Sequence, residues 1–189
     1  MLAEIEIEEP APYRSVRHAL RSAMAHEAYS ICGSPSFERT SRGYGSLTPW
    51  DRAAQSAIVI RLLHENCREH VIAAATAQFM PSEVTNPRGV LLSKAQGIDA
   101  CARHVQAYPH LRGYPADYLR DVVCLWADEL PSMSEPEWME EMQKSSRMLR
   151  YIKFGNPERG RPGVCELLDD LLGEAGGVLG LVYSDRGIV

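Results

Sequence analysis

The chain has 189 residues, a length that fits one domain or one domain with a small module. With 45% hydrophobic and 24% charged residues it resembles ordinary globular proteins with a buried core. The sequence has no run of about 18 apolar residues, so we expect no membrane span. The net charge is −5, and the first residues carry glutamates where a secretory signal needs positive charge. Five scattered cysteines are typical of reduced thiols, so we expect a cytoplasmic protein.

Helical patterns fill the first half of the sequence. Residues 1–12 alternate Ile and Glu and predict an acidic arm or a short edge strand. Apolar residues at helical spacing predict an amphipathic helix over Tyr13–Ile31, followed by a loop rich in Gly, Ser and Pro over residues 32–46. Thr48-Pro49-Trp50-Asp51 then has the cap, the proline and the acid of a helix start, and that helix runs to Asn66.

The second half continues in the same way. We predict helices over Glu69–Phe79, over Val90–Tyr108 and from Pro115 onwards, with a loop over residues 81–89 and a linker over 131–134. The glycines between 173 and 180 indicate a helix stop, and residues 178–183 are a second strand candidate. The fold class is therefore all-α. Residues 1–130 form a helical bundle for oligomerisation or partner contact, and residues 131–189 form a helix-turn-helix-like module with a C-terminal tail.

A basic segment stands out from this acidic chain. Between residues 144 and 161 six basic side chains face one acid, Glu158, which gives a local charge of +5. Charge asymmetry of this kind indicates an acidic partner, such as nucleic acid, rather than a particular fold. The basic residues are Lys144, Arg147, Arg150, Lys153, Arg159 and Arg161.

The helix predicted over residues 145–154 separates charge from apolar side chains. Steps of 100° place four polar residues within an arc of about 120°. Its opposite side can pack on the preceding helix. In a two-helix unit the second helix enters the major groove, so we expect Ser146, Arg147 and Arg150 to reach base edges and Lys144 and Lys153 to contact phosphates. The alternative is a basic face that is merely solvated. The four polar residues are Ser146, Arg147, Arg150 and Lys153, and the apolar ones are Met148, Leu149 and Ile152.

Two short motifs resemble DNA-binding elements. The spacing of Trp138, Met142, Ser145, Leu149 and Ile152 resembles a helix-turn-helix, although Gln143 takes the turn position usual for glycine and Lys144 that of a small aliphatic residue. The run Arg159-Gly160-Arg161-Pro162 resembles the core of an AT-hook, which implies that Arg159 and Arg161 lie in a narrow minor groove. The alternative for Pro162 is to begin the last helix.

Over a longer span the chain is similar to small phage- and prophage-encoded proteins suspected to act as late-gene regulators or antiterminators. The matching residues are Tyr13–Leu20, Leu47-Thr48-Pro49, Ala53–Ala57 and the C-terminal two-helix unit. The resemblance implies a bacterial cytoplasmic host, operator or promoter-proximal DNA as the ligand, and RNA polymerase as a partner.

Other chemistries fit the sequence less well. His64-x-x-Cys67 and Cys101-x-x-His104 each place two potential zinc ligands one helical turn apart, but structural zinc sites use loop-borne pairs, and buried cysteines are the simpler interpretation. Phosphate-binding and nucleophile motifs are absent from the sequence. We therefore predict no enzyme, no metal and no cofactor. The protein is expected to be a DNA-binding transcription regulator, and the alternative is a non-catalytic helical module that docks an acidic protein partner.

Overall fold

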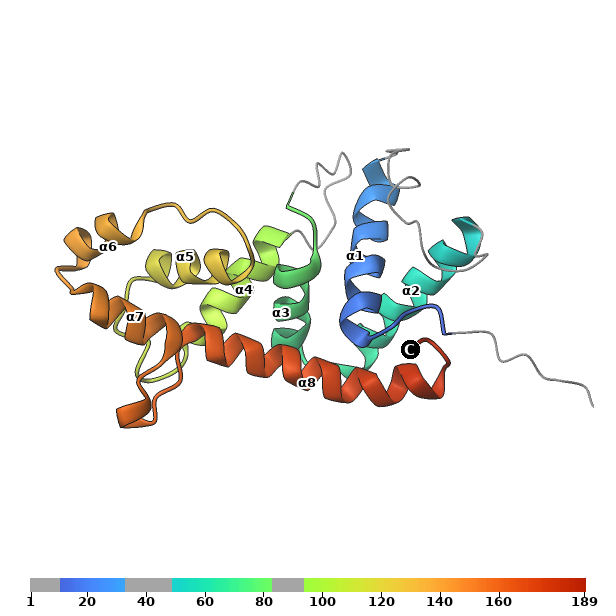
Figure 1. Ribbon diagram of the computed structural model, residues 1–189. Coiled ribbons are helices and arrows are strands. Elements are labelled where there is room, and N and C mark those ends of the chain that lie inside the picture. Colours follow the sequence, from blue (N-terminus) through green and yellow to red (C-terminus); the bar gives the residue numbers. More distant parts are fainter. Residues whose placement is uncertain (1–10, 33–48, 83–93) are drawn as a thin grey trace, which may run out of the picture.

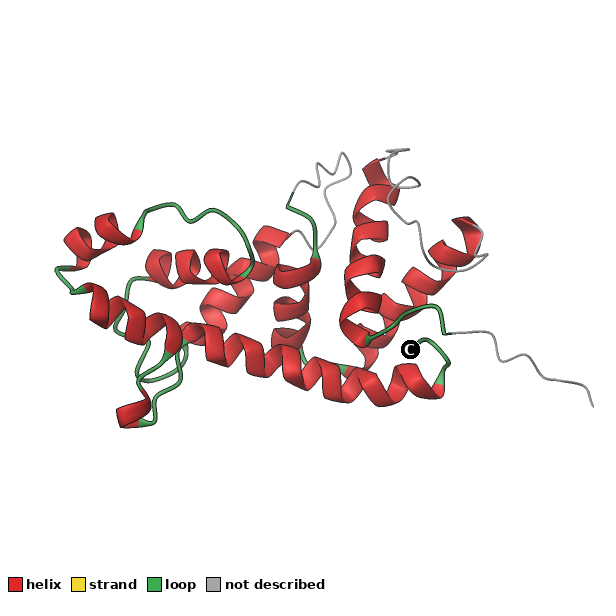
Figure 2. Cartoon of the chain, viewed as in Figure 1, coloured by secondary structure: helices red, strands yellow, loops and turns green. Residues whose placement is uncertain are grey.

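The computed structural model describes residues 11–32, 49–82 and 94–189 (Figure 1). Every regular element within these ranges is helical, so the predicted all-α class is confirmed (Figure 2). The extended pairing described in these ranges is an isolated antiparallel bridge between Asn156 and Arg161. None of the described helices is long and apolar enough to cross a membrane.

Three helices at the N-terminal side enclose one core. They are α1 (Val16–Cys32), α2 (Pro49–Asn66) and α3 (Glu69–Phe79), and the bounds predicted for α2 and α3 agree with the structure. Leu20, Val59 and Leu63 are buried at their junction. Residues 1–10 of the arm predicted over 1–12, the Thr48 cap and most of both predicted loops lie outside the described residues.

A second core lies between α3 and the following helices. These are α4 (Lys94–Gln106), α5 (Ala116–Trp126), α6 (Glu135–Met142) and α7 (Ser146–Phe154). Helix α4 lies directly on α3, because a Cβ atom at Gly97 would come within 2.7 Å of the Ala77 backbone nitrogen. Trp138 of α6 and Leu149 and Ile152 of α7 are buried in this core beside residues of α3, α4 and α5.

The last helix, α8 (Val164–Asp185), runs beneath both cores (Figure 1). Its first half buries Leu168 and Leu171 in the second core, and its second half buries Leu179 and Tyr183 in the first. The Tyr183 hydroxyl donates a hydrogen bond of 3.0 Å to the Val59 carbonyl in α2. The boundary that we predicted at residue 130 therefore does not divide the core, because residues on both sides of it pack together.

The predicted helix stop at the glycines is wrong, and so is the predicted strand at residues 178–183. Both segments are part of α8. Glycine costs about 1 kcal/mol relative to alanine inside a helix, but tertiary packing supplies most helix stability. Here the buried residues Leu171, Ala175, Leu179 and Tyr183 recur at helical spacing on one side, which holds α8 helical through Gly173–Gly180.

Asp121 of α5 is hydrogen-bonded to the segment that precedes α6. Asp121 is 2% exposed, and its carboxylate accepts hydrogen bonds from the backbone N–H groups of Ser132 and Met133, from the Ser132 hydroxyl and from the Trp138 indole. Burial alone would raise the pKa of this carboxyl, but these donors outweigh it and the pKa lies below its usual value. The predicted linker is thus hydrogen-bonded to α5 directly before α6 begins.

Candidate nucleic-acid interface

The turn between α6 and α7 has the geometry of a tight helix–helix connection. Gln143 adopts the left-handed backbone conformation (φ 50°, ψ 43°) that usually selects glycine at this position. The Ser145 hydroxyl then accepts a hydrogen bond from the Met148 backbone nitrogen and caps α7. The departure from the usual pattern at Gln143 therefore does not prevent the turn.

The outer side of α7 presents arginines to solvent. Lys144, Arg147 and Arg150 are exposed, and across the described ranges none of the six basic side chains between 144 and 161 forms an ion pair. Arg147 Nε donates to the Tyr151 hydroxyl at 2.8 Å, and the guanidinium carbon lies 5.4 Å from the centroid of that ring. This hydrogen bond, with the nearby charge of Glu158, raises the pKa of Arg147 and orders its side chain.

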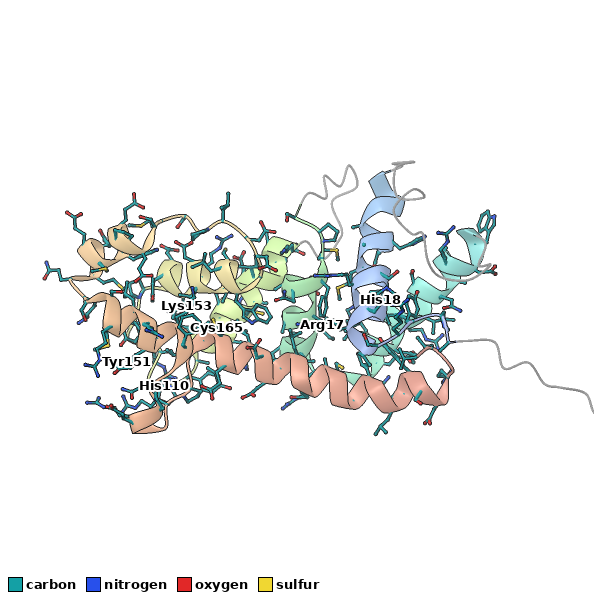
Figure 3. All side chains as sticks on the ribbon, viewed as in Figure 1. Arg17, His18, His110, Tyr151, Lys153 and Cys165 are labelled. Carbon is teal, nitrogen blue, oxygen red and sulfur yellow. The ribbon has the colours of Figure 1, made fainter. Side chains whose placement is uncertain are left out.

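Ser146 and Lys153, which we also predicted to contact DNA, have different surroundings from the arginines of α7. The Ser146 hydroxyl donates a hydrogen bond of 2.7 Å to a Glu135 carboxylate oxygen, so its proton is not available to a DNA base. The negative charge of Glu135 also lies at the N-terminal end of the basic face of α7. Lys153 is half-buried, with Nζ 5.1 Å from the Phe154 ring centroid, and it lies beside Cys165 at the junction with α8 (Figure 3). Burial raises the pKa of the Cys165 thiol, and the Lys153 charge opposes that rise.

The segment after α7, residues 155–163, forms a closed arm. Asn156 and Arg161 exchange backbone hydrogen bonds of 2.8 and 3.2 Å, and Gly160 is left-handed at φ 57°. The extended Arg-Gly-Arg conformation expected from the AT-hook resemblance is therefore not adopted, although Arg159 and Arg161 are both exposed. Pro162 does not begin α8, since Gly163 is its N-cap and Val164 its first residue.

Gly163 fixes the arm against the end of α7. A Cβ atom at this position would lie 2.2 Å from the Gly155 nitrogen and 2.6 Å from the Lys153 carbonyl oxygen. A side chain cannot be accommodated at such distances without moving backbone. The close backbone crossing keeps Arg159 and Arg161 at a set position beside α7.

The arm, α7 and the turn between α4 and α5 enclose a pocket of about 200 Å³ that sequence reasoning missed. Met148 was expected in the core, but it is 40% exposed and lines this pocket. His110 and Tyr114 line it from the turn, and Arg159 and Arg161 line it from the arm.

The suggested zinc ligands do not form a site. Among the residues that the structure describes, no group of three or more His, Cys, Asp or Glu side chains could hold a metal ion. The His104 ring stacks on His70 with 4.6 Å between centroids. Burial raises the pKa of Cys101 to about 12, which disfavours the thiolate that zinc binds.

No protein-family model, curated protein or solved structure matches this chain. Its chemistry is therefore interpreted from its own side chains. Exposed guanidinium groups form planar, bidentate hydrogen bonds with phosphates and with guanine edges. Arg147 and Arg150 of α7, with Arg159 and Arg161 of the arm, are four such groups within one sequence segment of 15 residues.

Proposed function

We propose that the protein binds double-stranded DNA through α7 and the arm, and that it acts as a transcription regulator. The observation that carries the proposal is the outer side of α7, where Arg147 and Arg150 are exposed while Leu149 and Ile152 are buried behind them. In this role Arg147 and Arg150 contact base edges, and Lys144 contacts a phosphate. Arg159 and Arg161 contact the backbone or the minor groove.

The arrangement of α6 and α7 supports this assignment. Helix α7 is the second helix of a two-helix unit, its N-terminus is capped by Ser145, and helix N-termini favour phosphate groups. Ser146 takes part as a base contact only if its hydroxyl leaves Glu135 or accepts a hydrogen bond from a base. Lys153, beside α8, contacts a phosphate only at the edge of the bound duplex.

The charge distribution orients the protein on DNA. The chain carries −5 overall but +5 between residues 144 and 161, so most of the surface is repelled by a duplex while this segment is attracted. Such a protein binds in one orientation rather than coating DNA. The resemblance to phage regulators leads us to include in the proposal an antiterminator role, with RNA polymerase contacted by the helices that remain free of DNA.

Fluorescence anisotropy with labelled duplex fragments tests the proposal. We expect binding at low salt, with log K falling against log salt by about 0.9 for each phosphate contacted. The double variant Arg147→Gln/Arg150→Gln should lose at least tenfold in affinity. The matched control Arg103→Gln/Arg186→Gln removes the same charge from exposed positions on α4 and at the end of α8, and it should bind as the native chain does. Absence of binding at low salt would reject the proposal.

A second function is favoured by one observation. An acidic carboxylate, Glu135, is bonded to Ser146 at the edge of the basic face, and it would be repelled by a phosphate. A partner protein with acidic side chains can avoid that point more easily than a regular duplex can. Under this alternative, polyglutamate displaces labelled DNA from the protein as effectively as unlabelled DNA does, and the protein prefers no duplex sequence.

A further inference from the structure

The pocket beside α7 combines aromatic walls with a cationic rim. Three separate segments form it: the turn between α4 and α5, one side of α7, and the arm. Its volume of about 200 Å³ is below the roughly 300 Å³ at which drug-sized ligand sites begin, so it suits one ring system rather than a large cofactor. Figure 3 shows Tyr151 and His110, which line the pocket, close together and below Lys153 and Cys165, which do not line it.

The walls of the pocket suit a flat apolar body. Tyr114 and Tyr151 contribute aromatic rings, and Met148 contributes a polarizable thioether. The Tyr114 hydroxyl contacts the Met148 sulfur at 3.9 Å, which links the two walls. Aromatic ligands gain affinity from such surroundings because rings pack face to edge or offset, and sulfur packs well at a ring edge.

The rim of the pocket suits a negative charge. Arg159 and Arg161 both line it and both are exposed, and neither is held by a carboxylate within the described part of the chain. His110 Nε2 lies 2.8 Å from the Pro162 carbonyl oxygen, which can only accept, so Nε2 carries a proton. The bond anchors the end of the arm to the turn at Pro162, directly after Arg161, and Arg159 lines the pocket from the same arm.

We propose that this pocket binds a small aromatic anion, a single flat ring system bearing a carboxylate or a phosphate, and that the bound anion competes with DNA for Arg159 and Arg161. The ring lies against Tyr114, Tyr151 and Met148, and the anionic group is bound by the two guanidinium forks. The first half stands on the pocket alone, whereas the second half rests on the DNA-binding role proposed above.

The pocket also adjoins the outer side of α7. Tyr151 lines the pocket while its hydroxyl accepts the hydrogen bond that orders Arg147. A ligand that moves the Tyr151 ring therefore changes the position of Arg147. Occupancy of the pocket thus removes two DNA contacts and disturbs a third, and the expected result is weaker DNA binding.

Isothermal titration of the full chain with four probes tests the binding half. Phenylacetate and phenyl phosphate carry the same ring with a carboxylate or a phosphate, benzyl alcohol carries the ring without an anion, and inorganic phosphate carries the anion alone. We expect one of the first two to bind with a Kd of about 1 mM or lower, and the last two to bind at least tenfold more weakly. Whichever of the first two probes has the lower Kd identifies the preferred anionic group as a carboxylate or a phosphate. Equal binding of all four, or of none, overturns the inference.

Matched variants locate the site. Arg159→Gln/Arg161→Gln should weaken the better anion at least tenfold, and Tyr114→Leu should weaken it severalfold without removing charge. The control Arg112→Gln removes one exposed arginine from the same turn, at a position that does not line the pocket, and should leave the Kd unchanged. An equal loss in the control would mean that the anion binds by general charge, and the inference would fail.

A competition experiment separates this inference from the proposed function. Saturating anion should reduce DNA affinity at least fivefold, measured by anisotropy at constant ionic strength. If the anion binds but the protein binds no DNA, the pocket stands and the proposed function falls. If DNA binds and the anion does not, the proposed function stands and the inference falls. If both bind without affecting each other, the competition half is overturned.

Discussion

Asp121 determines where the C-terminal helices attach. Its buried carboxylate accepts four hydrogen bonds from the 132–133 segment and from Trp138, so an amide in its place would face donors with its own N–H₂ group. We expect Asp121→Asn to lower the free energy of unfolding by about 3 kcal/mol, since a hydrogen bond to a charged group contributes about 1.5–3 kcal/mol. Urea denaturation measures the change. The control Asp117→Asn, at an exposed position of the same helix, should cost less than about 1 kcal/mol.

The same carboxylate gives the stability a pH dependence with a defined sign. Because the folded pKa of Asp121 lies below its value in the unfolded chain, the unfolded state binds the proton more readily. The stabilisation is therefore complete above the ordinary pKa of 3.8 and is lost as pH falls through the lower folded value. Asp121→Asn should flatten the acid side of the stability curve. An unchanged acid limb would contradict the role given to this residue.

Arg150 and Lys153 should have different effects on DNA binding. Arg150 is exposed on the outer side of α7, whereas Lys153 is half-buried beside α8. We expect Arg150→Ala to reduce the preference for specific over random duplex by about 1–3 kcal/mol, and Lys153→Ala to weaken all sequences alike. Competition anisotropy with specific and random DNA measures both. Equal losses on every sequence for both variants would contradict the assignment.

Among the elements, α8 offers a test of which glycines are needed. A Cβ atom at Gly177 would meet nothing within 4 Å, whereas one at Gly97 would meet the α3 backbone at 2.7 Å. Gly177→Ala should therefore stabilise the protein by about 0.5–1 kcal/mol through helix propensity. Gly97→Ala should destabilise it by about 1–3 kcal/mol through overpacking. Urea midpoints compare the two, and a loss of stability for Gly177→Ala would indicate a contact on that side of α8.

The bounds of a helix could be predicted from the sequence where caps, prolines and apolar spacing near its ends determine them. The small apolar run of α3 and the proline start of α2 predicted the bounds that the structure has. The continuation of α8 through its glycines did not follow, because contacts with α1, α2 and α3 outweigh local propensity. Asp121 could not be assigned either, since its donors depend on the fold of the segment after α5.

The candidate site was predicted only in part. Helical spacing placed Arg147 and Arg150 outward and Leu149 and Ile152 inward, as the structure has them. Spacing alone could not show that Lys153 lies toward α8 or that the arm closes through Asn156 and Arg161. The pocket was beyond prediction because it joins three segments that only the tertiary fold brings together.

At the scale of the whole molecule, α8 and α3 each contribute to both cores, so the two cores should unfold together. Leu179→Ala removes a fully buried side chain from the first core and should cost about 3 kcal/mol. Tryptophan fluorescence reports the second core, where Trp126 and Trp138 pack, while Trp50 is 85% exposed. We expect the fluorescence and circular dichroism midpoints to fall equally. A shift in only one probe would show independent cores.

A control on the same helix completes that test. Leu181 is 74% exposed, so Leu181→Ala should change the free energy of unfolding by no more than about 0.5 kcal/mol. A cost similar to that of Leu179→Ala would mean that the outer side of α8 is covered by another molecule.

The position of α8 in the chain has a consequence for biosynthesis. Both cores need residues after 163, and the Tyr13 backbone nitrogen bonds the Ile188 carbonyl oxygen at 3.1 Å. At about 5–20 residues per second, a ribosome completes α8 roughly ten seconds after α3. During that interval the helices that pack on α8, such as α1, α2 and α3, lack this cover and are open to chaperones. The nascent chain therefore gains the native form of both cores only after α8 has left the exit tunnel.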